Sequence, residues 1–467
     1  MKTYLFYDIE TTGLNKAFDQ VLQFAAIRTD TEFREIERHV LSVKLNCDVV
    51  PSPGAVITHL IGLEHPANGL SEFAAIEKIH ALFNHPGTVG VGYNTLGFDD
   101  EFLRFSFYRN LLPPYTHQYA NQCGRFDIYP ITVFYYLFRT ALLQWPTDNG
   151  TPSLKLENIN TANQFFKGSA HDAMVDVEVT LALAKKLATD KPMWDYLLGY
   201  FDKRTDQERL LKLPKTFNNQ HEAIYVEGVL GAKNRFQAPV VHCGEHRHYK
   251  NQQVFLRLDL PALRETTLST IKENTWSIYK KLGEPGFLLP PEERFLTAMK
   301  PERLIECEKN KTWLLENPSL YKAIVNYHLD FKYPAHPATD ADAALYCNGF
   351  LSDAEQHLCQ QFHAVQDKAA LLSRFDNECL ATMALRILGR HFQETLSQDQ
   401  QARFAHYLQQ THHEDIIDYR GEKRLTPAKA LQDILELKAT KALSDAQQAA
   451  LEALREYCER LCKMALP

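Results

Sequence analysis

The stretch TYLFYDIETTG, residues 3–13, decides the fold and stands near the start of the chain. From Thr3 to Ile9 it is rich in aromatic, aliphatic and β-branched residues, a composition typical of a β-strand. Alternate residues of a strand project from the same face, so Asp8 and Glu10 share one face, roughly 6.5–7 Å apart along the chain. Two carboxylates at the end of an apolar strand are costly unless a positive charge lies between them. A divalent cation bound through oxygen ligands would supply that charge, whereas the alternative for so short a motif is two exposed acids.

The segments that follow this strand predict a mixed α/β domain over residues 1–188. Strand candidates at Val21–Thr29 and Arg38–Leu45 have short polar connections, which favour an antiparallel meander. Strands then alternate with helices, so helices are expected to cover the sheet. The further elements predicted here are a buried strand at Thr88–Tyr93, a helix at Asp100–Leu112, a short strand at Phe126–Ile128 and a helix at His171–Ala188.

The remainder of the chain divides into a β-rich region and a helical region. At roughly 150 residues per domain, 467 residues suggest about three domains. Glycine-punctuated β-like runs predict a small barrel or sandwich with helical insertions at 189–338, followed by a helical region at 339–467. Three helix starts in the last region carry the capping-box pattern, at Ser352, Ser397 and Ser444.

Composition excludes several classes of protein. Hydrophobic residues make up 45% and charged residues 23%, values typical of a globular chain rather than a disordered one. We expect no membrane helix and no signal peptide. The nine cysteines are scattered without a C-x-x-C pair, which favours reduced thiols and a cytoplasmic location. The formal net charge is −7, so any nucleic-acid binding must depend on local patches.

More acids occur where they could join Asp8 and Glu10. Asp99, in GYNTLGFDDEF (residues 92–102), stands at a predicted helix N-terminus, where an acid is also a good cap. His171 and Asp176 open the last helix of the region but are not on one helical stripe. Four carboxylates and a histidine are what two-metal phosphodiester cleavage requires, with the neutral imidazole taking a proton from the attacking water.

These motifs, in this order, resemble those of a known family. DIETTG, then N-x-x-x-FD, then H-x-x-x-x-D are similar to the DEDDh exonucleases over residues 4–188. Segments such as QFAAIRTDTEF, PSPGAVITHLIGL and YCNGFLSDAE resemble the bacterial exodeoxyribonuclease I family over essentially the whole chain. The resemblance implies a ribonuclease H-like exonuclease domain, an SH3-like barrel domain and a helical C-terminal domain, which together form a C-shaped clamp on single-stranded DNA.

The resemblance also assigns roles to residues by matching motifs. It implies that Asp8, Glu10 and Asp176 are metal ligands, that Asp99 is the remaining acid, and that His171 is the general base. The residues implied to contact the DNA strand are Glu10, Arg104, Tyr115, Tyr119 and Lys155. Several positions depart from the family: Lys155 replaces an arginine and lacks its planar fork, Tyr119 replaces a tryptophan, and Val133 replaces a contacting arginine. Ile9 stands where the family has tyrosine, and TTG where it has T-F-G.

The activity implied is processive 3′→5′ degradation of single-stranded DNA to 5′-mononucleotides in repair and recombination. It would need two Mg²⁺ ions, with Mn²⁺ as a substitute. The partner implied is the bacterial single-stranded-DNA-binding protein, through its acidic C-terminal tail, and the protein is expected to be a monomer. Two alternatives stay open: an RNA or proofreading exonuclease of the same superfamily, which usually lacks two further domains, and a non-enzymatic strand-binding scaffold.

Two weaker patterns lie in the middle region. Gly228–Asn251 carries four basic residues against one acid, Glu245, which is either part of a DNA path or a solvated hairpin. The histidines at 242, 246 and 248 are capable of metal binding, but their spacing fits no dependable zinc pattern.

Overall fold

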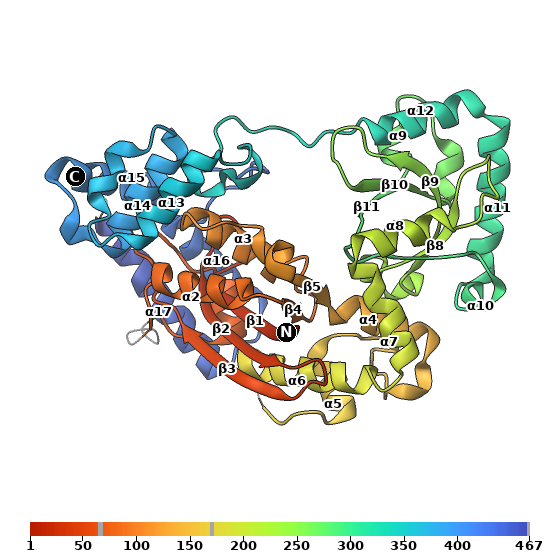
Figure 1. The fold of residues 1–467 in the computed structure, drawn as a ribbon, viewed down its shortest axis with the longest axis horizontal. Helices are drawn as coiled ribbons and strands as arrows, with labels where there is room; N and C mark the ends of the chain where they lie inside the picture. Colours follow the sequence, from red (N-terminus) through yellow and green to blue (C-terminus); the bar gives the residue numbers. More distant parts are fainter. Residues whose placement is uncertain (64–68, 169–171, 465–467) are drawn as a thin grey trace.

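The first part of the molecule is a mixed five-stranded sheet. The computed structural model describes residues 1–63, 69–168 and 172–464. The sheet has the order β3-β2-β1-β4-β5, in which β1 pairs antiparallel with β2 and parallel with β4 (Figure 1). The predicted mixed α/β fold is therefore confirmed. The strands are β1 (Thr3–Thr11), β2 (Val21–Thr29), β3 (Glu35–Ser42), β4 (Thr88–Gly92) and β5 (Gly124–Asp127).

Both faces of β1 are covered by helices, as the alternation of its side chains requires. Leu5 and Tyr7 pack in a core cluster with residues of α2 (Glu72–Asn84) and α3 (Asp99–Arg109). Tyr4 and Phe6 point to the opposite face and pack with residues of α4 (Ile128–Phe138) and α6 (Ala173–Leu187). Because Asp8 and Glu10 continue the even-numbered series, they face α6.

Element ends differ from the predictions by a few residues. The strand expected at Arg38–Leu45 begins earlier, at Glu35, and the helix expected from Asp100 begins at Asp99. The short strand β5 ends at Asp127, because the Asp127 carboxylate accepts the backbone N–H of Tyr129 at 2.9 Å and caps α4. The remaining elements of this part are α1 (Pro53–His59), α5 (Leu156–Asn163) and the two-stranded ribbon of β6 (Thr147–Asp148) and β7 (Thr151–Pro152).

The second part is a curled antiparallel half-barrel, in agreement with the predicted β-rich middle region. Its strand order is β11-β10-β9-β8-β12, and α11 and α12 pack against it through a shared apolar cluster (Figure 1). The strands are β8 (Glu222–Val226), β9 (Gln237–Glu245), β10 (Gln252–Arg257), β11 (Ser277–Lys281) and β12 (Phe287–Leu289). The helices are α7 (Lys191–Leu198), α8 (Lys203–Leu211), α9 (Ile271–Asn274), α10 (Glu293–Leu296), α11 (Pro301–Glu316) and α12 (Pro318–Leu329).

The third part is helical and lies beside the first, across an extended connection from the second (Figure 1). The predicted capping boxes form at Ser352, Ser397 and Ser444. The helices are α13 (Asp353–Ala364), α14 (Glu378–His391), α15 (Gln398–His413), α16 (Pro427–Thr440) and α17 (Asp445–Met464). No helix in the described part of the chain combines the length and hydropathy that crossing a membrane requires. The expected domain boundaries after residues 188 and 338 stay a prediction.

Candidate active site

Three carboxylates meet where β1 ends beside the first turn of α6. One oxygen each of Asp8, Glu10 and Asp176 can be chosen so that all lie within 4.8 Å of one another. Strand alternation brings the first two to the α6 face, and Asp176 lies in the first turn of that helix. In the described part of the chain this is the one such group of metal-capable side chains. Its all-oxygen donor set suits a hard divalent cation such as Mg²⁺ or Mn²⁺.

The electrostatics of this carboxylate cluster are those of a site that needs positive charge. Burial raises the pKa of Asp8 well above its usual range, and three neighbouring carboxylates raise it further. Burial and the charges of Asp176 and Asp99 raise the pKa of Glu10 to about 8. A bound cation reverses these effects because it stabilises the ionised carboxylates.

Asp99 lies next to the cluster and is held there by the backbone of β1. Its carboxylate accepts a hydrogen bond from the backbone N–H of Ile9, the residue between Asp8 and Glu10, and burial raises its pKa to about 8. Asp99 does not cap α3, whose N-cap residue is Phe98 without a side-chain cap. The Asp99 carboxylate interacts with its own backbone N–H as well as with that of Ile9, which lies between Asp8 and Glu10.

Asp127, which the sequence patterns did not single out, builds the loop that leads to Asp99. Its buried carboxylate accepts the backbone N–H groups of Asn94 at 2.7 Å and Leu96 at 3.1 Å. This contact ties the end of β5 to the loop between β4 and α3. A lone aspartate after a short strand gives no local signal of such a role, because its partners are backbone groups about 30 residues away.

The predicted general base, His171, lies outside the described residues, so its role stays a prediction. The residue that follows it in the described part, Asp172, caps α6 by accepting the backbone N–H of Met174 at 3.0 Å. The cap fixes the first turn of α6, which carries Asp176.

The residues implied to contact DNA lie in different settings. Arg104 is buried, lies 2.5 Å from Asp100, and its guanidinium stands 5.9 Å from the centre of the Tyr115 ring. Tyr119 is 70% exposed, so its ring is accessible for stacking. Lys155 is exposed and lies 3.9 Å from Glu157. Val133, at the position where the resemblance implies an arginine, lies on α4 and is fully buried in the core.

The structure places the basic residues and the histidines of the two weaker middle-region patterns in different settings. Lys233, Arg235 and Lys250 are exposed, but Arg247 is hydrogen-bonded to Asn326 and paired with Asp330. The histidines at 242, 246 and 248 take no part in a metal-capable group within the described residues.

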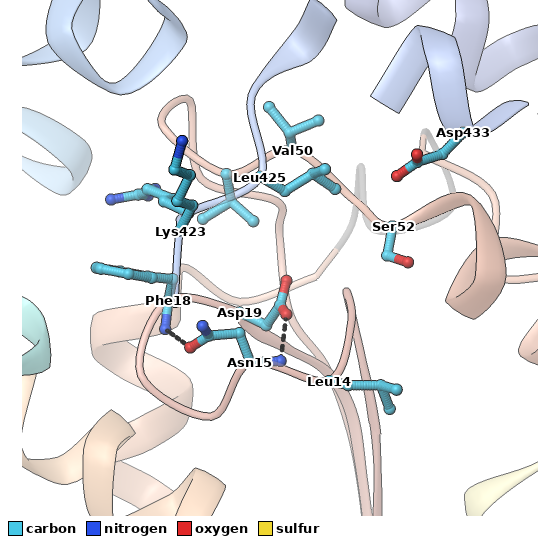
Figure 2. A pocket seen from close by; sticks show the side chains of 11 residues that line it. Leu14, Asn15, Phe18, Asp19, Val50, Ser52, Lys423, Leu425 and Asp433 are labelled. Atoms are coloured by element: carbon cyan, nitrogen blue, oxygen red, sulfur yellow. Dashed lines mark hydrogen bonds between the residues drawn. The ribbon is translucent and has the colours of Figure 1, made fainter. Parts of the chain in front are cut away.

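Two cavities are present whose lining residues do not include Asp8, Glu10 or Asp176. One, of about 180 Å³, lies between the loop after β1 and residues 423–425 of the helical part, and Figure 2 shows Asn15 and Asp19 on one wall with Lys423 on the other. Its walls combine apolar side chains such as Leu14, Val50 and Leu425 with polar ones, and the Asp19 carboxylate accepts the backbone N–H of Asn15 at 2.8 Å. The second, of about 380 Å³, lies between residues 94–97 and the turn at Gly228.

Comparison with known proteins covers nearly the whole chain. A family profile described as Exonuclease matches residues 5–184, and one described as Exonuclease I C-terminal domain matches residues 339–461. Exodeoxyribonuclease I of Escherichia coli K12 is 30% identical over 486 residues, covering 98% of both chains. Exodeoxyribonuclease I of Haemophilus influenzae is 27% identical and covers 90% of this chain and 92% of its own length.

Solved structures agree with the sequence relatives. The crystal structure of E. coli Exonuclease I in complex with a dA16 oligonucleotide superposes with a TM-score of 0.82 at 28% identity, over 99% of this chain and 100% of the other. A structure of SSB/Exonuclease I in complex with the inhibitor CFAM gives a TM-score of 0.80, also at 28% identity, over 99% of this chain and 100% of the other.

Proposed function

This chain belongs to the exodeoxyribonuclease I family, and from that premise we propose that it degrades single-stranded DNA processively from the 3′ end to 5′-mononucleotides. The observation that carries the proposal is the convergence of Asp8, Glu10 and Asp176 within 4.8 Å of one another. The likeness to a structure with a bound oligonucleotide, over the full length of both chains, supports a strand of DNA as the substrate.

The family is metal-dependent, and the finer proposal is two Mg²⁺ ions, for which Mn²⁺ can substitute. Asp8, Glu10 and Asp176 would hold metal through carboxylate oxygens, and Asp8 alone would be shared between both ions. When bound, the ions supply stabilisation of the attacking and leaving oxygens of the phosphodiester. His171 would accept the proton of the attacking water, since neutral imidazole is a base near neutral pH. Asp99, oriented by the backbone of Ile9, completes the acidic wall of the site.

Strand binding is proposed to use Glu10 at the terminal nucleotide and four further side chains. Tyr115 and Tyr119 would stack on bases, an interaction that tolerates any sequence. Arg104 lies against the Tyr115 ring, and Lys155 is exposed where its charge can meet a phosphate. Lysine offers a point charge rather than a bidentate fork, so this contact would be weaker than that of an arginine.

The setting of the activity is proposed on the same grounds. A complex of a single-stranded-DNA-binding protein with Exonuclease I has been solved, and we propose that this chain likewise binds the acidic C-terminal tail of such a protein. Further proposals are a monomer that acts in the cytoplasm in DNA repair and recombination, with domains at 1–188, 189–338 and 339–467.

Electrophoresis of end-labelled oligonucleotides tests the function directly. With Mg²⁺, a 5′-labelled single strand should pass from full length to a short product with few intermediate lengths, and a 3′ label should be released at once as a mononucleotide. The same oligomer in EDTA, and a matching RNA oligomer, should stay intact. Degradation in EDTA, or equal decay of RNA, would contradict the proposal.

Two variants make the test specific to the carboxylate cluster. Asp8→Ala and Asp176→Ala should abolish degradation without loss of the fold. The control is Asp195→Ala, which removes an acid whose ion pair with Lys191 is exposed and contributes little to stability. Persistent activity in either cluster variant would contradict the assignment.

A further inference from the structure

Asp100 follows Asp99 in the chain but faces a different part of the molecule. Successive residues of an α-helix are about 100° apart around its axis. Asp99 therefore faces β1, while the Asp100 carboxylate lies 2.5 Å from the Arg104 guanidinium and 3.1 Å from Nε2 of His117. It also pairs with Arg125 of β5. Asp100 is 2% exposed, so these partners replace water around it.

The two arginines around Asp100 connect it to the other parts of the molecule. Arg125 pairs at 2.6 Å with Glu284, in the loop after β11 of the half-barrel. Arg104 donates to the hydroxyl of Tyr346, at the start of the helical part, at 3.4 Å. Tyr346 in turn donates to Glu101 of α3 at 3.1 Å. Side chains from the other two parts are thus connected to the Asp100 carboxylate through these two arginines.

The charges require Asp100 to be an anion that holds two cations in place. Burial opposes its ionisation, but Arg125 and Arg104 outweigh burial and hold the pKa of Asp100 well below its usual range. Without this carboxylate, the buried guanidinium of Arg104 and the half-buried one of Arg125 would have one counter-ion fewer. Like charges repel, so at least one of them would have to leave its present position.

We propose that Asp100 is a positioning residue that holds Arg104 against Tyr115 on the DNA-binding surface and links that surface, through Arg125, to Glu284 of the half-barrel. The inference rests on the proposed function, since it takes Arg104 and Tyr115 to contact the strand. Asp99 and Asp100 then divide two tasks between neighbouring positions: one belongs to the catalytic site and the other to substrate binding.

Asp100→Asn tests the proposal, with Glu72→Gln as a matched control. Glu72 pairs with Arg109 at the other end of the same helix, at 2.6 Å, and is as buried as Asp100. Binding of a fluorescent single-stranded oligomer is measured by anisotropy in EDTA, where no hydrolysis interferes. Mn²⁺ binding without DNA is measured in parallel.

We expect Asp100→Asn to weaken strand binding at least about tenfold, the scale of one lost charged contact, while Mn²⁺ binding is unchanged. Glu72→Gln should leave both unchanged. The change in net charge alone predicts tighter strand binding by Asp100→Asn, because removing an anion near DNA strengthens binding. Tighter or unchanged binding by Asp100→Asn, or an equal loss in Glu72→Gln, would overturn the inference.

A second pair of variants keeps the test decisive if Asp100→Asn does not fold. Asp100→Asn combined with Arg125→Met removes one anion and one cation, and Arg125→Met alone is its reference. The double variant should bind the strand more weakly than the reference, and equal binding would overturn the inference. If the wild type binds no single-stranded DNA, the proposed function is overturned as well. If the wild type binds normally and the double variant binds as tightly as Arg125→Met, the inference alone is overturned.

Discussion

Two groups of acids in this molecule differ in what surrounds them. In the carboxylate cluster of Asp8, Glu10 and Asp176, the strongest charges acting on Asp8 are other carboxylates. The second group, here called the arginine cluster, places arginines between its acids. Its members are Asp48, Asp340, Asp342, Arg386, Arg390, Arg424 and Tyr407.

The arginine cluster satisfies its acids internally. Arg390 lies 2.7 Å from Asp48 and 2.5 Å from Asp342. Burial opposes ionisation of Asp48, but Arg390 and Arg424 hold its pKa well below the usual range. Asp48 lies in the first part of the molecule and the arginines in the helical part, so this cluster joins the two. The comparison shows that burial alone does not distinguish the two groups of acids; the sign of the surrounding charge does.

The largest expected effect is on activity, from Asp8→Asn. The change removes one negative charge from the carboxylate cluster, which weakens metal binding. It should lower the rate of strand hydrolysis at least about 10³-fold, which corresponds to several kcal/mol of lost transition-state stabilisation by the metal. In EDTA the variant should be as stable as the wild type or more so, because one of several mutually repelling acids is gone. Hydrolysis rates and urea unfolding in EDTA measure both. If Asp8→Asn keeps its activity or is strongly destabilised, Asp8 stabilises the fold as the acids of the arginine cluster do and does not serve catalysis.

The converse change, Asp48→Asn, should affect stability rather than chemistry. It leaves buried guanidinium groups short of a counter-ion and should lower the free energy of unfolding by about 3–5 kcal/mol, measured by urea denaturation. The control, Asp415→Asn, removes an exposed partner of Lys423 and should cost less than about 1 kcal/mol. The hydrolysis rate per folded molecule should not change. If Asp48→Asn lowers the hydrolysis rate without lowering the free energy of unfolding, the proposed difference between the carboxylate cluster and the arginine cluster is wrong.

Local patterns were sufficient for most of the fold and for the shared face of Asp8 and Glu10, whereas the resemblance to the family was needed to add Asp176. The strand at Val21–Thr29 was predicted to the residue, and the alternation along β1 placed Asp8 and Glu10 on one face. These predictions succeed because period-2 alternation and turn residues act over a few neighbouring positions. Element ends were predicted less well, because tertiary contacts decide them: Asp127 ends β5 by capping α4.

What the sequence could not predict depends on pairs that are distant along the chain. The contact between Arg390 and Asp48 joins residues 342 positions apart, and no local pattern marks either. Asp99 and Asp100 look equivalent as neighbouring acids at a helix start, yet they face β1 and Arg104 respectively. Arg104 was expected to contact the strand and is buried against Asp100, which only the packing of three parts reveals.

Metal should stabilise one group of acids and not the other. At about 100 times its dissociation constant, Mg²⁺ should raise the free energy of unfolding of the wild type by about 2.7 kcal/mol, by mass action alone. Asp48→Asn should gain as much, because its change lies outside the carboxylate cluster. Asp8→Asn should gain far less. Thermal unfolding with and without Mg²⁺ measures all three, and an equal gain in Asp8→Asn would mean that the stabilising ion binds elsewhere.

The smallest expected effect is on the pH dependence of stability in EDTA, where the two groups should have opposite slopes. Burial and the charges of Asp176 and Asp99 raise the pKa of Glu10 from 4.5 to about 8. Between these values the folded state keeps a proton that the unfolded chain releases, so this contribution to stability is lost as pH rises. Asp48 and Asp342 have pKa values held below 3.8, so their contribution is lost as pH falls below that value.

Variants assign each slope to its group. Glu10→Gln should reduce the loss of stability between about pH 5 and pH 8, because one of the groups that hold an extra proton is gone while Asp8 and Asp99 keep theirs. Glu10→Gln should still lose stability as the pH falls below about 3.8. Asp48→Asn should lose less stability in that acidic range, and its loss of stability between about pH 5 and pH 8 should be unchanged. Melting temperatures in EDTA from about pH 3 to pH 9 follow both. If Glu10→Gln keeps the full loss above pH 5, the mutual repulsion of the carboxylates is not what distinguishes this cluster, and the contrast with the arginine cluster fails at its electrostatic basis.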